Sequence, residues 1–253
     1  MDAAPDETLR RRPVPEASNL RDLGGYRTAD GATVKWRTLY RSNNLAGLSD
    51  AGVAAVAALG IRAYCDFRSE SEQRAKPSRL PLENPPALVS LAIEPKVVDA
   101  LRALIADPGS TGEDIAQLVA AAYRDYGRDH VAQYRAFFDR LVEGAHYPLL
   151  FHCAAGKDRT GYAAAMVLRA VGVPLELVYE DFLLTNQYWD GAMALNLEAR
   201  PDLRAVLTGV RPDYLDAAFD GIDATYGTFD RYLEDGLGLT QRRLEALRDR
   251  LLE

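Results

Sequence analysis

One short apolar run constrains the fold of this chain more than any other segment. Residues 147–153 read Tyr-Pro-Leu-Leu-Phe-His-Cys, a composition typical of a central parallel strand that is covered on both faces. A helical pattern of apolar residues follows from 159 to 171. Together they predict a strand, a tight loop and a helix in succession, and therefore an α/β protein with a central, mostly parallel sheet flanked by helices.

Two further segments are expected to form strands. Residues 61–67 have the composition of a second buried strand. A hairpin is expected over residues 26–42, because Asp30-Gly31 suits a tight turn, with residues 33–39 as its second strand.

The other predicted elements are helices. Ser49 can cap a helix that Gly60 ends, and Thr111 with Asp114 resembles a capping start for another. Helical spacing of apolar residues recurs in five segments, at 114–126, 131–141, 175–184, 215–222 and 240–252.

The length and composition favour one domain. With 48% hydrophobic residues in 253, the chain can bury one sizeable core, which we expect over residues 19–253. Residues 1–18 hold three prolines among charges, so we expect a loosely ordered N-terminal arm there.

Several functional classes are disfavoured. The net charge of -7 argues against a nucleic-acid surface. No apolar run approaches the ~20 residues of a spanning helix, and no secretory signal pattern is present, so we expect a cytoplasmic protein and leave non-classical secretion open. Two cysteines and three scattered histidines indicate neither a disulfide framework nor a metal site.

The loop after the apolar run carries the chemistry. Cys153 ends the predicted strand, and Arg159 follows after five residues, at the start of the predicted helix. In such a loop successive backbone N–H groups can point inward, and the helix adds the positive end of its dipole. A glycine in the loop permits a backbone conformation that a side chain would oppose. We therefore predict an anion cradle formed by Ala154, Ala155, Gly156, Lys157, Asp158 and Arg159.

This environment would stabilise a thiolate on Cys153, which is an anionic nucleophile. Arg159 can bind two phosphoryl oxygens at once and stabilise the charge of the transition state. Thr160 can donate a hydrogen bond to the sulfur and help it leave. The residues predict hydrolysis of a phosphate monoester in two steps through phosphocysteine, with no cofactor and no metal.

The segment from His152 to Thr160 resembles the signature of the protein tyrosine phosphatase superfamily, which reads His, Cys, five residues, Arg and then Ser or Thr. Other segments are similar to a bacterial and fungal branch of tyrosine/serine phosphatases, atypical dual-specificity and lipid-acting enzymes that include a secreted mycobacterial phosphatase: residues 19–26, 40–42, 66–68, 226–233 and 237–240.

The resemblance covers roughly residues 19–252 and carries several implications. It implies the Cys-x5-Arg phosphatase fold and a phosphorylated protein as substrate, with phosphotyrosine first and phosphoserine, phosphothreonine and phosphoinositides as extensions. It also implies that the stretch 97–126, which is long for a connection, forms a mobile helical lid or insertion over the pocket. A plain packing layer is the alternative.

Two aspartates compete for the role of general acid, which protonates the leaving group. The resemblance implies Asp158, because lipid-acting relatives place their acid inside this loop. Asp66 follows the strand 61–65 and would lie at the mouth of the pocket if that strand neighbours residues 147–153. We favour Asp158. The alternatives are a loop-stabilising acceptor for Asp158 and a salt bridge to Arg68 or Arg41 for Asp66.

Several other residues near the motif allow more than one interpretation. Lys157 adds a cation that similar loops use for phosphoinositides, or it is a solvated surface lysine. Cys65 is a core cysteine, or it forms a reversible disulfide with Cys153. His152 is expected to shape the loop through the backbone of the cysteine. Structural roles are expected for Asn19, Arg21, Asp22, Arg41 and Arg68, with a ligand contact as the alternative, and Arg21 could help to orient a loop of the pocket.

Two other functional classes compete with an active phosphatase. A non-catalytic phosphate reader would keep the cradle, but the combination of Cys153, Asp158 and Arg159 counts against it. A rhodanese-like sulfurtransferase also uses a loop cysteine, but the loop length and the Arg-Thr ending favour phosphate.

Overall fold

A computed structural model describes residues 7–189, 191 and 200–253. Five strands form one sheet in the order β1-β2-β5-β3-β4. Their bounds are Arg21–Asp22 for β1, Leu39–Ser42 for β2, Ala63–Asp66 for β3, Ala87–Ser90 for β4 and Leu149–His152 for β5. Only β1 and β2 pair antiparallel, and the other neighbours run parallel. The predicted α/β architecture with a mostly parallel sheet is confirmed, and the apolar run supplies the central strand.

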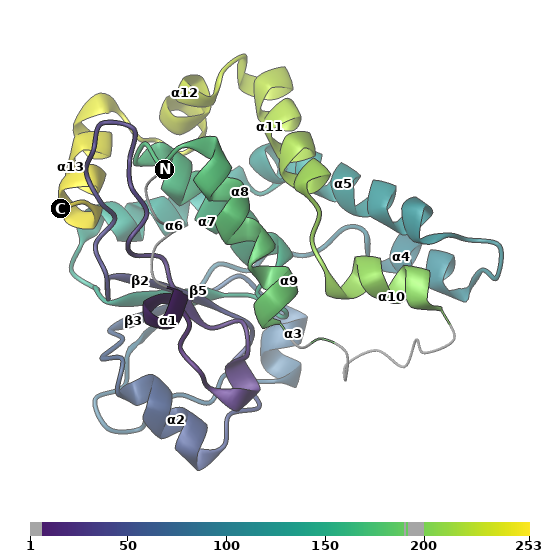
Figure 1. The fold of residues 1–253 in the computed structure, drawn as a ribbon, viewed down its shortest axis with the longest axis horizontal. Coiled ribbons are helices and arrows are strands. Elements are labelled where there is room, and N and C mark those ends of the chain that lie inside the picture. Colours follow the sequence, from purple (N-terminus) through teal and green to yellow (C-terminus); the bar gives the residue numbers. More distant parts are fainter. Residues whose placement is uncertain (1–6, 190, 192–199) are drawn as a thin grey trace.

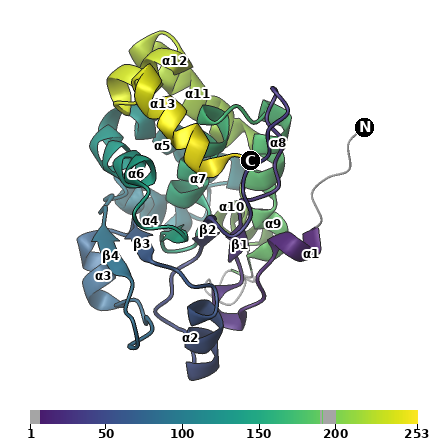
Figure 2. The ribbon, with the colours of Figure 1, turned by 90° about the vertical axis from the view of Figure 1, so that its left-hand side faces the viewer.

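Helices cover the two faces of the sheet unequally. Figures 1 and 2 show α2 on one side and most of the other helices on the opposite side. The helices and short helical turns are α1 (Glu7–Arg10), η1 (Pro15–Ala17), α2 (Asp50–Ala57), α3 (Glu70–Ala75), α4 (Val98–Ala106), α5 (Gly112–Asp129), α6 (Val131–Glu143), α7 (Asp158–Ala170), α8 (Leu175–Leu183), α9 (Thr185–Tyr188), α10 (Pro201–Thr208), α11 (Pro212–Tyr226), α12 (Phe229–Arg231), η3 (Tyr232–Gly236) and α13 (Gln241–Leu251). None of the helices in the described residues is both long enough and apolar enough to cross a membrane.

Successive residues of the central strand enter different cores. Leu149 and Phe151 pack in the large core under most of the helices, while Leu150 packs in the smaller core beneath α2. Tyr64 and Cys65 of β3 divide in the same way. Because both faces are buried, these strands lack the polar alternation of a half-exposed strand.

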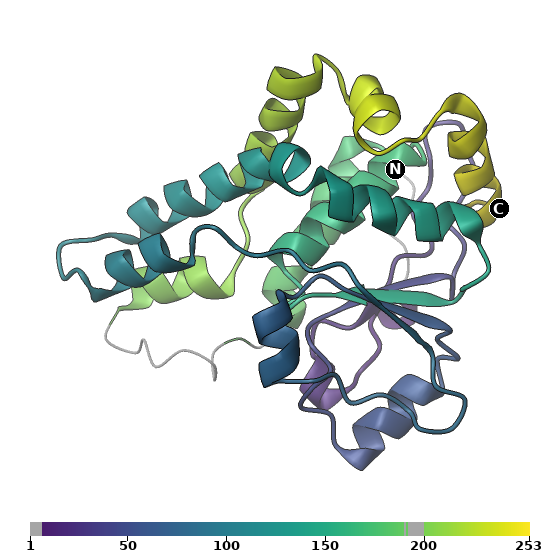
Figure 3. The same cartoon turned by 180° about the vertical axis from the view of Figure 1, so that it is seen from behind.

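A helical protrusion extends from the side of the sheet core (Figure 3). It comprises α4, α10 and the first half of α5, and it has a small apolar cluster of its own around Ile115, Leu203 and Leu207. The second half of α5 carries Tyr123 and Tyr126 into the main core. The stretch 97–126 predicted as a lid or packing layer is therefore α4 together with most of α5.

The predicted hairpin forms but is shorter than expected. Val34 exchanges backbone hydrogen bonds with Gly25 and Tyr26, and Arg27 forms an antiparallel bridge with Thr33. The turn at Asp30-Gly31 forms, with Gly31 at a φ of 94°, and residues 33–35 also exchange backbone hydrogen bonds with residues 251–253. The strand that joins the sheet comes later, at Leu39–Ser42. The C-terminal segment adds to the pairing of the hairpin's second strand, and the local sequence does not reveal this.

The expectation of a loose arm over residues 1–18 is corrected for residues 7–18, and residues 1–6 lie outside the described residues. Arg10 is 2% exposed. Its guanidinium lies over the Tyr26 ring at 3.8 Å and donates to the carbonyl oxygen of Asp22 at 3.0 Å. A cation stacked on an aromatic ring and bonded to the backbone can be buried, so the arm packs against the fold.

A buried ion cluster ties the sheet to α8. Asp181 of α8 accepts hydrogen bonds from Arg21 of β1 at 3.1 Å and from Arg41 of β2 at 2.7 Å, and all three side chains are at most 1% exposed. Burial alone would raise the pKa of Asp181, but the two guanidinium groups outweigh it and hold the pKa at about 2. Each buried charge is thus compensated only while the others are present.

We expect Asp181→Asn to lower the free energy of unfolding by about 3–5 kcal/mol, because it leaves two buried guanidinium groups without their shared anion. Urea denaturation at neutral pH measures this. Asp99→Asn is the matched control, since Asp99 pairs with Arg102 while its side chain is 96% exposed, and it should change stability by less than about 0.5 kcal/mol.

The wild type and Asp181→Asn can also be compared as a function of pH. A carboxyl group whose pKa falls from 3.8 to about 2 on folding stabilises the protein fully above about pH 4 and loses this effect as the pH falls toward 2. The stability difference between wild type and Asp181→Asn should therefore narrow over that range. A difference that stays constant would contradict the assignment of the charge to Asp181.

Candidate active site

The predicted loop lies at the carboxyl end of β5, where α7 begins at Asp158. Cys153 is 2% exposed and Arg159 is 7% exposed. Ala154, Ala155 and Asp158 are partly exposed and form the opening. The carboxyl edge of a parallel sheet is the usual place for a ligand site in such folds.

The carbonyl groups of the loop are held from outside. The Ala154 oxygen accepts bonds from the backbone and side chain of Asn44 at 2.9 and 3.0 Å. The Ala155 oxygen accepts from Asn19 at 3.1 Å, and the Gly156 oxygen accepts from Arg41 at 2.9 Å. In a trans peptide the next N–H group points the opposite way. The N–H groups that follow these carbonyls therefore face inward, as an anion cradle requires.

Gly156 is required for this loop to close. Its φ is +69°, and a Cβ atom there would lie 2.3 Å from the backbone oxygen of Ser42. The predicted reason for a glycine in the loop is confirmed by both observations.

Arg159 is fixed along one edge of its guanidinium group. Its NH1 and NH2 donate to the two carboxylate oxygens of Glu72 at 2.7 and 3.1 Å. NH1 also donates to the carbonyl oxygens of Phe67 and Ile93, both at 3.2 Å. None of these bonds uses Nε, so the edge formed by Nε and NH2 remains available for two oxygens of a tetrahedral anion.

The electrostatics agree with this arrangement. Burial opposes the charge on Arg159, but the neighbouring Cys153 and Glu72 outweigh burial and raise the pKa of Arg159. The guanidinium group therefore stays charged inside the site.

The role of Glu72 was not predicted from the sequence. It occupies the third position of α3, where its carboxylate accepts from the backbone of Ser69 at 2.7 Å in a capping box. The pattern Ser-x-x-Glu before a helix was readable as a cap. Nothing local to it indicates that the same carboxylate reaches Arg159, which lies 87 positions away.

The two candidate acids have different surroundings. Asp158 lies at the opening with its side chain 29% exposed, and its Oδ1 accepts from the hydroxyl of Tyr123 at 3.2 Å. Asp66 is 1% exposed and accepts several hydrogen bonds from Arg68, the shortest at 2.6 Å. The structure thus brings Asp158 to the cradle and engages Asp66 in the salt bridge that was its alternative role.

Lys157 is not a solvated surface lysine, because it is 7% exposed. Its Nζ donates to the carbonyl oxygen of Gly209 at 3.1 Å and lies 3.5 Å from Asp158 Oδ2. Thr160 is fully buried, and its hydroxyl has no hydrogen-bond partner in the part of the chain that the structure describes. The Lys157 amine is thus held by polar contacts, whereas the Thr160 hydroxyl keeps its hydrogen-bonding capacity unused among the described residues.

His152 has the predicted loop-shaping contact. Its Nδ1 lies 3.2 Å from the carbonyl oxygen of Cys153. Burial lowers the pKa of His152, so the neutral ring donates from Nδ1 to that oxygen. The backbone of the cysteine is held in place by the residue before it.

Cys65 is a core residue. It lies opposite Phe151 in the sheet register, and burial raises the pKa of its thiol to about 12. Both cysteines are free thiols in this structure. These observations favour the core reading of Cys65 over the redox reading.

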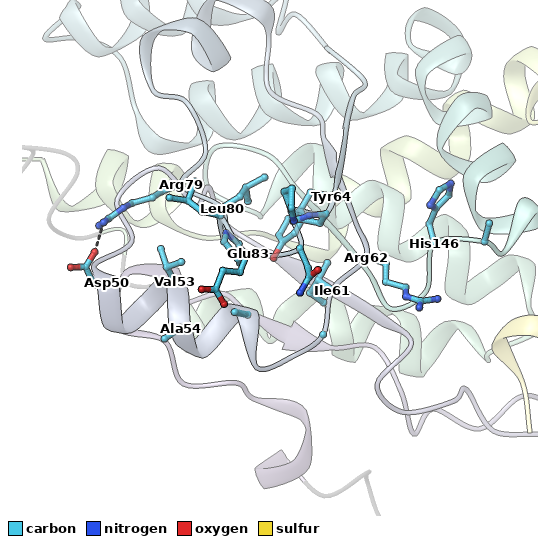
Figure 4. A pocket seen from close by; sticks show the side chains of 18 residues that line it. Asp50, Val53, Ala54, Ile61, Arg62, Tyr64, Arg79, Leu80, Glu83 and His146 are labelled. Carbon is cyan, nitrogen blue, oxygen red and sulfur yellow. Dashed lines mark hydrogen bonds and ion pairs between the residues drawn. The ribbon is translucent and has the colours of Figure 1, made fainter.

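Within the described ranges, no three His, Cys, Asp or Glu side chains gather as a metal ion would need. A groove of about 1020 Å³ lies between α2 and residues 79–86. Figure 4 shows its lining side chains, among which Arg79 pairs with Asp50. The groove lies at the amino ends of the strands, away from the cradle, and contains none of the predicted site residues.

Comparison with known proteins identifies relatives along most of the chain. A family model described as the tyrosine phosphatase family matches residues 12–253. A protein of Cupriavidus necator named "Putative tyrosine-protein phosphatase" is 37% identical over 238 residues, covering 90% of this chain and 85% of that protein. The triple specificity protein phosphatase PtpB of Mycobacterium tuberculosis is 32% identical over 280 residues, covering 95% and 99%. A tyrosine-protein phosphatase of Nostoc commune is 27% identical over 225 residues, covering 83% and 73%.

We expect Glu72→Gln to lower kcat for an aryl phosphate about tenfold, because a loosened Arg159 no longer meets the phosphoryl oxygens in a fixed geometry. Glutamine can still complete the capping box, so α3 should remain folded. Glu70→Gln is the matched control on the same helix, since the Glu70 side chain is 73% exposed. An unchanged kcat for Glu72→Gln would show that Arg159 needs no such support.

Proposed function

Because this chain belongs to the tyrosine phosphatase family and is therefore a cysteine-dependent protein-tyrosine phosphatase, we propose that it hydrolyses phosphotyrosine through a phosphocysteine intermediate on Cys153. One observation carries the proposal. Three consecutive carbonyl groups beside Cys153 are bonded from outside the loop, which leaves the inward N–H groups to bind phosphate around the sulfur.

The first step forms a P–S bond and breaks the P–O bond to the leaving group. The Cys153 thiolate attacks phosphorus, Arg159 binds two of the phosphoryl oxygens, and Asp158 gives its proton to the departing oxygen. The dephosphorylated tyrosine leaves as a neutral phenol.

The second step reverses the roles. Water attacks phosphorus, the Asp158 carboxylate takes a proton from that water, and the P–S bond breaks to release inorganic phosphate and the thiolate. The unpartnered hydroxyl of Thr160 is available to donate to the departing sulfur.

We extend the proposal to phosphoserine, phosphothreonine and phosphoinositides. The name of the mycobacterial relative describes a triple specificity, and the Lys157 amine adds a second cation 3.5 Å from Asp158. An in-loop acid supports this range of substrates, because alkyl leaving groups need a proton more than aryl leaving groups do.

We also propose that the protein is located in the cytoplasm.

We also propose that the protrusion of α4, α10 and the first half of α5 acts as a lid. Cys153 is only 2% exposed, so a substrate needs a wider opening than the structure presents. The protrusion has an apolar cluster of its own around Ile115 and Leu203, and it packs on the main core through Ala116, Val119 and Val206, so a movement would pivot at these contacts.

The central test is a panel of phosphopeptides and phosphoinositides with EDTA present. Wild type should turn over the phosphotyrosine peptide, and Cys153→Ser should lose at least about a thousandfold in rate. Asp158→Asn should lose about 10²- to 10⁴-fold on a phosphoserine peptide but little on 4-nitrophenyl phosphate. If Cys153→Ser turned over the peptide at the wild-type rate, Cys153 would not be the nucleophile. If Asp158→Asn lost the same factor in rate on both substrates, Asp158 would not be the general acid.

The lid is tested by the rate at which iodoacetamide alkylates Cys153 in the folded protein. Leu203→Ala should loosen the protrusion and raise that rate several-fold. Leu247→Ala removes an equally buried leucine in α13 and should leave the rate near that of wild type. Equal rates in all three proteins would mean that the protrusion does not control access.

A further inference from the structure

Tyr123 reaches the proposed acid from outside the phosphate loop. It lies on α5, is fully buried and donates from its hydroxyl to Asp158 Oδ1 at 3.2 Å. The contact joins residues 35 positions apart. Tyr123 therefore lies outside the loop signature at residues 152–160.

The position of the Tyr123 hydroxyl is determined by packing. Its ring lies 5.1 Å from that of Tyr126, 5.4 Å from that of Tyr214 and 6.0 Å from that of Phe182, measured between centroids. Such contacts leave an aromatic side chain few alternative rotamers. Burial, and then the charge of Asp158, raise the pKa of Tyr123 well above its usual value. The group is therefore a phenol that only donates to the carboxylate.

Asp158 needs such a partner more than the rest of the loop does. The backbone of the loop is held by its carbonyl groups, but the Asp158 side chain is 29% exposed and can rotate. Its other carboxyl oxygen, Oδ2, lies 3.5 Å from Lys157 Nζ, and Lys157 is bonded in turn to Gly209. Tyr123 is thus the rigid partner of the pair that contacts this carboxyl group.

We propose that Tyr123 is a positioning residue for the general acid: it fixes Oδ1 so that Oδ2 faces the oxygen of the leaving group. The inference rests on the proposed role of Asp158. An acid that is misplaced costs little when the leaving group departs readily as an anion, and much when it must be protonated. Tyr123 therefore acts mainly on substrates with poor leaving groups, such as phosphoserine.

The experiment measures kcat/KM for Tyr123→Phe on a series of aryl phosphates with different leaving groups and on a phosphoserine peptide. We expect a loss of about tenfold on the phosphoserine peptide and less than about twofold on 4-nitrophenyl phosphate, because the one hydrogen bond that orients the acid is removed. Asp158→Asn and the double variant are measured beside it. The double variant should match Asp158→Asn, since Tyr123 acts only through that carboxyl group.

Tyr162→Phe is the matched control for a merely structural role. Tyr162 is fully buried in the same aromatic cluster, and its hydroxyl donates to that of Tyr232 at 2.9 Å. It should lower the melting temperature about as much as Tyr123→Phe does, without a loss that depends on the leaving group.

The outcomes separate two failures. If Asp158→Asn depends on the leaving group while Tyr123→Phe slows all substrates equally, or if the two losses multiply in the double variant, the positioning role is overturned and the acid stands. If Asp158→Asn itself shows no dependence on the leaving group, the acid role fails and the positioning role fails with it.

Discussion

The whole site depends on one buried carboxylate between two arginines. Asp181 forms an ion pair with both Arg21 and Arg41, and each arginine also contacts the phosphate loop in its own way. Arg41 donates directly to the oxygen of Gly156, and Arg21 bonds the side chain of Asn19, which in turn holds Ala155. A backbone loop of this kind has no ladder of its own to keep its N–H groups aimed inward. Its shape is imposed by polar groups whose burial is tolerated only because their charges compensate one another.

The loop and its strand could be predicted because their causes are local. Cys153, Gly156 and Arg159 lie within seven consecutive residues, so their relative placement follows from chain geometry once a strand ends and a helix begins. Capping chemistry is equally local, and the structure confirms Ser49 and Thr111 as caps. A segment whose hydrogen bonds stay inside it can be read from its own residues.

The supports of the loop could not be predicted for the opposite reason. Glu72, Tyr123 and Asp181 each sit in a helix whose sequence is explained without them, as a cap, a core aromatic and an acid on an amphipathic face. Their second role exists only because the sheet order brings distant segments to one edge. The pairing of residues 33–35 with residues 251–253 has the same origin, since it joins the hairpin to the distant end of the chain. A single sequence therefore indicates the chemical groups of a site more clearly than it indicates the long-range contacts that position them.

The charges around Cys153 also constrain how the site can work. A phosphate dianion has to enter a space that already holds the sulfur, the Glu72 carboxylate and Asp158, against Arg159 and the more distant Lys157. The Glu72 carboxylate binds one edge of the Arg159 guanidinium group. It orients Arg159 and also offsets part of the positive charge of that group. The remaining attraction must come from the inward N–H groups and the start of α7, whose dipoles are fixed and need no counter-ion. This division explains why so much of the buried polar structure serves the backbone of the loop rather than the side chains that meet the substrate.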